Sequence, residues 1–213
     1  MAFISNGTTM LDAGAFSVSL GSMVLIKTLT ASSSANLTFV HGSASVVLDS
    51  TYPVYLFKFI NIHPADDNGR FFQVNFRDGG SDYDATKTTT AFRTTHTEAG
   101  SGTSLAYQTN GDLAQSTSFQ KLHFNVDGDN DSCLAGTLHL FNPSSTTFVK
   151  HFISDCVAVN PNPGADTFHV AGYCNTTTAI DGVQFKFDSD NIESGTVKPV
   201  SYTHLRAHET NSN

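Results

Sequence analysis

Hydrophobic and polar residues alternate along many short runs of this chain. Phe72, Val74 and Phe76, for example, have polar residues between them. A period of two places every second side chain on the same face of a β-strand, so these runs predict strands with one buried face. The side chains that this pattern predicts to be buried are Leu56, Phe72, Val74, Phe76, Leu122, Phe124, Leu138, Leu140, Val183, Phe185 and Phe187.

The spacing of the runs predicts a β-sandwich. About ten runs are separated by clusters of Asp, Asn, Gly and Pro, which favour turns. No window shows a convincing helical period, although Asp112–Phe119 has room for one helical turn. The Thr-rich stretch within Asp82–Gly111 predicts an edge strand, followed by a loop at Thr97–Ser104. We therefore expect an all-β, antiparallel two-sheet sandwich that is jelly-roll-like.

Composition and charge argue against some classes of function. The chain has 213 residues, with 17 Phe and 6 Tyr to fill a core. Its net charge is −8 with only 11 Lys+Arg, which does not suit a phosphate backbone, so we expect no nucleic-acid partner. Met1–Leu20 lacks the basic start and continuous apolar segment of a signal peptide. The longest apolar run near the start, Met23–Ile26, is too short to span a bilayer, so we also expect no membrane insertion.

The acidic turn Asp127–Asp131 is a candidate metal site. Asp127, Asp129 and Asp131 are spaced as oxygen ligands that suit calcium. An EF-hand loop would also need Gly and Glu at the positions held by Ser132 and Leu138, so that match fails. The alternative is a solvated turn between two strands.

A second acidic turn is a candidate ligand site. Asp78, Asp82 and Asp84 surround a flexible Gly-Gly pair, and Tyr83 could stack on a sugar ring. The alternative is a polar hairpin. If both acidic turns lay at the same end of the sandwich, their carboxylates would favour a shared calcium ion or polar ligand.

Other reactive residues form no recognisable site. The spacing of Cys133, Cys156 and Cys174 matches no zinc pattern. The cysteines are therefore expected to be small buried side chains or, alternatively, to form one disulfide bridge. The histidines are scattered, with only His139 and His151 placed to approach each other across strands. There is no nucleophile elbow and no phosphate loop. Paired glycosidase carboxylates would need only proximity, although Trp, common in sugar-cleaving clefts, is absent.

Four segments carry a resemblance to a known group of proteins. They are Val54–Gly80 (VYLFKFINIHPADDNGRFFQVNFRDGG), Leu25–Thr30 (LIKTLT), Phe141–Phe152 (FNPSSTTFVKHF) and Gln184–Lys198 (QFKFDSDNIESGTVK). With these segments the chain resembles small virion-associated proteins of tailed bacteriophages from marine environments.

This resemblance implies a non-enzymatic structural component of the virion, in the tail or fibre or on the capsid surface, assembled in the host cytoplasm. It implies other virion proteins and further copies of the chain as partners, and a host-surface glycan as a further contact. A lectin-like carbohydrate-binding module is the alternative function, and an enzyme is the third.

The end of the chain changes character. Ile192–Lys198 is predicted as the last strand, opened by a turn at Glu193–Gly195. The phage proteins end with a short apolar segment at this point, whereas residues 199–210 here are PVSYTHLRAHET. That peptide resembles translated sequencing-adapter read-through. We therefore expect one sandwich domain over residues 1–198, with an N-terminal arm of about 20 residues, and a disordered or non-native tail over 199–213.

Overall fold

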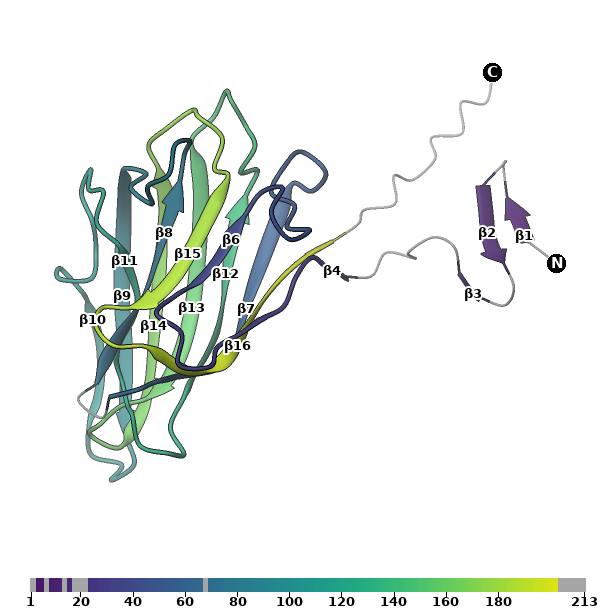
Figure 1. Cartoon of the computed structure of the whole chain (residues 1–213). Coiled ribbons are helices and arrows are strands. Elements are labelled where there is room, and N and C mark those ends of the chain that lie inside the picture. The colour runs from purple at the N-terminus through teal and green to yellow at the C-terminus, as the bar shows by residue number, and fades with distance from the viewer. Residues whose placement is uncertain (1–2, 6–7, 13–14, 17–22, 67–68, 203–213) are drawn as a thin grey trace, which may run out of the picture.

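Two antiparallel β-sheets pack face to face (Figure 1). The computed structural model describes residues 3–5, 8–12, 15–16, 23–66 and 69–202. The large sheet contains, in spatial order, β10 (Thr103–Tyr107), β9 (Lys87–Thr97), β14 (Gly164–Cys174), β13 (Lys150–Val159), β12 (Leu134–Phe141), β7 (Val54–Pro64), β16 (Ile192–Tyr202) and β4 (Met23–Leu25), with β5 (Leu29–Thr30) also paired to β16. The small sheet contains β11 (Gln120–Val126), β8 (Arg70–Arg77), β15 (Gly182–Phe187) and β6 (Leu37–Val40).

The predicted all-β sandwich is therefore confirmed, while its jelly-roll connectivity stays a prediction. The N-terminal arm contains β1 (Phe3–Ser5), β2 (Thr8–Asp12) and β3 (Ala15–Phe16), which form a sheet of their own. The described part of the chain includes no helix long and apolar enough to span a membrane.

Aromatic rings from both sheets fill the core. The Phe185 ring on β15 lies 5.1 Å from that of Phe59 and 5.4 Å from that of Phe57, both on β7. All the side chains that the alternation predicts to be buried are buried. Leu56 differs from the rest, because it pairs with His139 on the face of the large sheet that points away from the core.

Bulges break the expected alternation in β11. The pairing of β11 with β8 shifts register on both sides of His123. His123 is fully buried, although the period of two placed it on the outer face. The neighbouring Asn75 on β8 was also expected to face outward. It is fully buried, because the segment before β11 covers it and Thr117 accepts its hydrogen bond.

Four further expectations were wrong. The Thr-rich β9 is not an edge strand, because β10, which lies partly in the predicted loop, pairs with its outer side. Asp112–Phe119 contains no helical turn. The last strand does not end at Lys198, because β16 continues to Tyr202 and Val200 pairs with Leu56 of β7. The predicted turn at Glu193–Gly195 is a bulge inside β16, where Gly195 adopts a φ of 117°.

Candidate functional site

The acidic turn between β11 and β12 is closed by its own hydrogen bonds. Ser132 donates from its hydroxyl to the Asp127 carboxylate (3.1 Å) and from its backbone N–H to the carbonyl oxygen of Asp129 (2.8 Å). Asp127 is only 7% exposed, whereas Asp129 and Asp131 are exposed. The turn is thus an ordered connection with two of its three carboxylates in solvent.

A hollow of about 270 Å³ lies beside this turn. Its lining residues are Glu98, Asp127, Asp129, Asp131, Ser132, Val159, Asn160, Pro161 and Pro163. The sequence had not indicated Glu98, which reaches the hollow from the β9–β10 hairpin. Although four carboxylates line the hollow, no group of three or more His, Cys, Asp or Glu side chains in the described ranges is arranged to hold a metal ion. The calcium site at Asp127, Asp129 and Asp131 therefore remains a hypothesis, since no such arrangement of ligands supports it.

The second acidic turn, Asp78–Asp84, packs against its own sheet. A Cβ on Gly182 would lie 3.2 Å from the Tyr83 hydroxyl oxygen, so this ring lies against the start of β15. Burial raises the pKa of Tyr83, which lies near the ion pair of Arg77 and Asp181. Asp82 and Asp84 are exposed, and Asp82 accepts a hydrogen bond from Ser81. Packing leaves little of the Tyr83 ring free to stack on a ligand.

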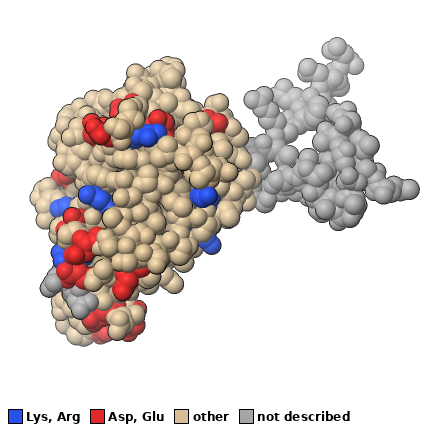
Figure 2. All heavy atoms as spheres, viewed as in Figure 1, with Lys and Arg blue, Asp and Glu red and all other residues tan. Residues whose placement is uncertain are grey.

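The two acidic turns lie at opposite ends of the sandwich. Asp78 follows the last residue of β8, whereas Asp127 follows Val126, which pairs with the first residue of β8. Eight extended residues span roughly 25 Å. The hypothesis of a shared site is therefore wrong. Figure 2 shows acidic side chains gathered towards the two ends, with a mostly uncharged surface between them.

The outer face of the large sheet, which points away from the small sheet, is unusually apolar. The cross-strand register places on it Leu56, Lys58, Ile60, Thr88, Thr90, Phe92, Thr94, His96, Ala135, Thr137, His139, Phe141, His151, Ile153, Asp155, Val157, Val159, Ala165, Thr167, His169, Ala171, Tyr173 and Lys198. Val157 is 45% exposed and Phe92 42% exposed. The outward residues of a sandwich strand are usually polar, so this face is a candidate contact surface.

Histidine rings pack beside aromatic rings across this outer face. The rings of Phe92 and His169 stack with their centroids 4.7 Å apart, and His169 also pairs with the Asp155 carboxylate (2.5 Å). His139 stacks on Phe141 at 6.1 Å. As expected from the sequence, His139 and His151 are close, being diagonal neighbours on β12 and β13. These contacts cover the strands with flat rings.

A hollow of about 500 Å³ opens on the same outer face. Small residues, among them Ala135 and Ala165, line it together with Val157, Val159 and His96. Most of its wall is apolar, although Glu98 also lines it, so it can receive an apolar side chain of a partner. The sequence carried a signal for this surface: β13 has apolar residues on both of its faces.

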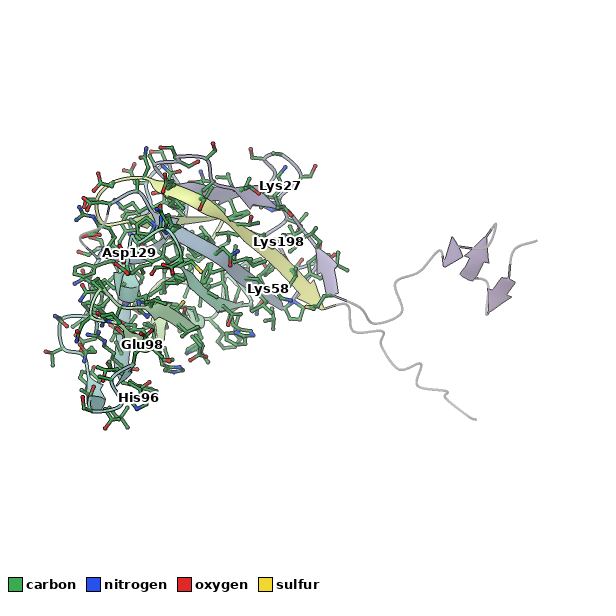
Figure 3. The ribbon with its side chains drawn as sticks, turned by 90° about the horizontal axis from the view of Figure 1, so that it is seen from below. Lys27, Lys58, His96, Glu98, Asp129 and Lys198 are labelled. Carbon is green, nitrogen blue, oxygen red and sulfur yellow. The ribbon has the colours of Figure 1, made fainter. Side chains whose placement is uncertain are left out.

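Unpaired charges lie at opposite sides of the outer face. Lys58 and Lys198 lie directly opposite each other on β7 and β16. Figure 3 shows these lysines at one side of the sheet, and Glu98 and Asp129 at the other. None of these four side chains forms a salt bridge within the described part of the chain. Two adjacent ammonium groups repel each other, so an acidic partner would be favoured there.

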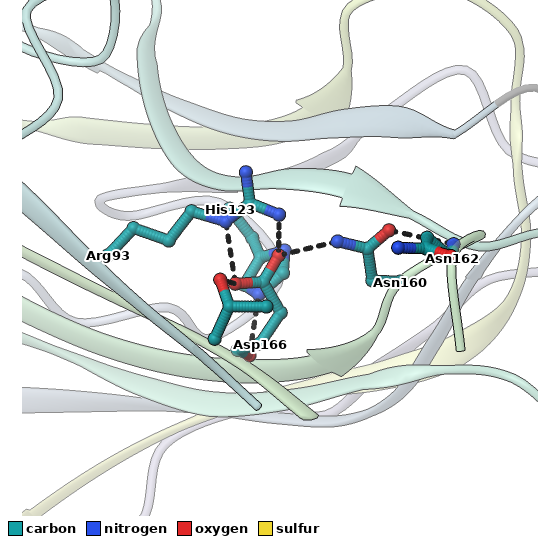
Figure 4. A network of polar contacts seen from close by, with 6 residues as sticks. Arg93, His123, Asn160, Asn162 and Asp166 are labelled. Carbon is teal, nitrogen blue, oxygen red and sulfur yellow. Dashed lines mark hydrogen bonds and ion pairs between the residues drawn. The ribbon is translucent and has the colours of Figure 1, made fainter. Parts of the chain in front are cut away.

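A polar network is buried between the sheets (Figure 4). The Asp166 carboxylate forms an ion pair with Arg93 and accepts a hydrogen bond from Asn160 (3.2 Å). His123 Nε2 donates to the backbone carbonyl of Asp166 (3.0 Å), and His123 Nδ1 is buried with no hydrogen-bond partner among the described residues. Burial lowers the pKa of His123. The sequence did not indicate this network, because its members come from separate strands and turns.

The three cysteines are free. Cys156 and Cys174 are buried, as expected for small apolar side chains, and Cys133 is half-buried. Burial raises the pKa of each buried thiol to about 12, so these two are held as unreactive thiols.

Comparison of the chain with family models, with curated proteins and with solved structures found no match. The functional argument therefore depends on the geometry of the molecule itself.

Proposed function

We propose that this protein is a non-enzymatic structural component of a tailed-phage virion, in the tail or fibre or on the capsid surface. It works by contact through the outer face of the large sheet. The observation that supports the proposal is the exposed apolar and aromatic surface along β13, β14 and β9, in the middle of a sheet whose outward residues would otherwise be polar.

Charge favours a second copy of the chain as one partner. The outer face carries Lys58 and Lys198 at one side of the sheet, and Glu98 and Asp129 lie in the turns at the other side. If two copies meet face to face about a two-fold axis, the lysines of each copy can approach the acidic residues of the other. The apolar strip around Val157 then lies at the centre of the contact, where burial contributes most.

The test is sedimentation velocity of the full chain over a range of concentrations. We expect the wild type to form a discrete oligomer and Val157→Lys to shift it to monomer, because a lysine at the centre of the contact would be buried without a partner. Phe148→Lys is the matched control: Phe148 is 69% exposed but lies in the turn between β12 and β13. A wild type that stays monomeric, or Val157→Lys that associates as the wild type does, would contradict the proposed contact surface.

A carbohydrate-binding module is the second candidate. The observation that favours it is the hollow lined by Glu98, Asp127, Asp129, Asp131 and Asn160, because carboxylates and amides bind sugar hydroxyls. Among the residues that the structure describes, no aromatic side chain lines that hollow to provide a stacking platform. Glycan binding that Asp129→Asn abolishes, in a chain that does not self-associate, would favour this candidate over the first.

A further inference from the structure

A buried lysine contacts a buried asparagine where the two sheets meet. Lys87 begins β9 in the large sheet, and Asn75 lies on β8 in the small sheet. Both residues are 0% exposed. Lys87 Nζ lies 2.5 Å from Asn75 Oδ1 and 2.6 Å from the carbonyl oxygen of Ala85. An amine and a carboxamide are thus held in contact, away from water.

No carboxylate in the described ranges lies within ion-pair distance of the Lys87 ammonium. Burial is the largest influence on the pKa of Lys87, and Cys174, Asp84 and Asp78 act in the opposite direction. Burial lowers the pKa of Lys87 to about 8, so a neutral amine is accessible near neutral pH. A desolvated, neutral lysine amine is a nucleophile.

The Asn75 carboxamide is held as the matching electrophile. Its Oδ1 accepts a hydrogen bond from the backbone N–H of Phe76 (2.9 Å), and its Nδ2 donates to the carbonyl oxygen of Thr117 (2.9 Å). A backbone N–H directed at the carbonyl oxygen stabilises the negative charge that develops when a nucleophile adds to the carbon. The fold also holds both groups together, which removes the entropy cost of an encounter.

We propose that Lys87 and Asn75 form an intramolecular isopeptide bond that ties the two sheets together. The lysine amine adds to Cγ of Asn75, the Cγ–Nδ2 bond breaks, and Nδ2 leaves as ammonia. The proton released by the lysine ammonium is taken up by the ammonia, so one ammonium and one carboxamide become one secondary amide and one ammonium ion. The reaction needs no oxidant and no second reactant. It also removes an unpaired positive charge from the protein interior, where such a charge is unfavourable.

A second buried lysine provides a matched control. Lys150 lies in the same cross-strand row, because it pairs with Cys174, which pairs with Lys87. Its ammonium donates to the backbone carbonyl oxygens of Thr176 (3.2 Å) and Thr178 (2.6 Å). Both oxygens belong to main-chain amides, and attack of the lysine amine on a main-chain amide would cleave the chain. Lys150 is buried as Lys87 is, but within the described ranges no side-chain carboxamide accepts a hydrogen bond from its ammonium.

The intact mass of the full chain, measured under denaturing conditions, tests this proposal. We expect a wild-type mass lower than the sequence mass by one ammonia. Peptic digestion should give a branched peptide that contains both Lys87 and Asn75. Lys87→Arg and Asn75→Ala should each have the full sequence mass, and Lys150→Arg should keep the loss.

Two results would overturn the proposal. The first is a wild type with its full sequence mass after folded protein has been incubated at a pH above the pKa of Lys87, a result that does not depend on whether any variant folds. The second is a loss of ammonia that persists in Lys87→Arg. That result would indicate a succinimide, formed when the backbone nitrogen of Phe76 attacks Asn75. Mild base would then hydrolyse the succinimide, and the mass would rise by one water.

Discussion

At the scale of single residues, His123 shows how a bulge changes chemistry. The bulges in β11 turn its ring into the core, where the hydrogen bond to the Asp166 carbonyl places the proton on Nε2. Nδ1 then carries a buried lone pair with no donor facing it. Adding a second proton would place an imidazolium in the core next to the Arg93–Asp166 pair. Burial accordingly lowers the pKa of His123 below its usual value of 6.5.

This geometry predicts a loss of stability in mild acid. Below about pH 6.5 the unfolded chain binds a proton on His123 that the folded protein does not bind. The free energy of unfolding should therefore fall by up to about 1.4 kcal/mol per pH unit as the pH decreases, until the lowered folded pKa is reached, and His123 should contribute nothing above pH 6.5. Urea denaturation at a series of pH values measures this change in the free energy of unfolding.

His123→Gln keeps an amide donor for the Asp166 carbonyl but cannot titrate, so its stability should fall less steeply in acid. His96→Gln, at an exposed position on β9, controls for the loss of one histidine. If His123→Gln kept the wild-type dependence on pH, another group would be responsible for it.

At the scale of elements, β15 alternates as predicted from Val183 to Phe187. Phe185 faces the core and contacts rings of β7 and β8, whereas its neighbour Gln184 donates to the Thr38 hydroxyl (3.0 Å). Phe185→Ala should destabilise the protein by about 3–5 kcal/mol, because it leaves a cavity among aromatic rings. Gln184→Ala removes one hydrogen bond and should cost about 1 kcal/mol. Chemical denaturation of both variants tests the register, since the reverse order would mean that the strand faces the other way.

The sequence predicted most strands, because alternation is a local property. It could not predict the bulges in β11, since a bulge depends on the pairing of β11 with β8. It also missed β10, a strand of polar and apolar residues that are all exposed, so burial shows no contrast between its two faces. The continuation of β16 through Pro199 was missed for a similar reason: β7, distant in sequence, holds Val200 and Ser201 in the sheet.

At the scale of the whole molecule, topology decided which candidate residues meet. The two acidic turns were equally good candidates for a common site in the sequence. The antiparallel pairing of β8 with β11 placed them at opposite ends. The same topology brought Glu98 beside Asp127 and Asp129, which no local pattern indicated. Local patterns thus identified the polar turns, but only strand order could show which of them share a surface.

The outer face of the large sheet is the feature on which the functional account depends. It combines exposed aliphatic side chains along β13, histidines beside aromatic rings, and opposite charges at its two sides. A surface of this kind is suited to protein–protein contact, and the absence of a built metal cage among the described residues leaves the acidic hollow as the weaker candidate.

The most direct test of the central claim is quantitative mass spectrometry of tailed-phage particles, purified by density gradient from a culture whose phage encodes this chain. We predict that peptides of the chain co-purify with the particles through the gradient, in a constant ratio to a known tail or capsid protein. Peptides found only in the infected-cell lysate, and absent from purified particles, would contradict the claim that this protein is a structural component of the virion.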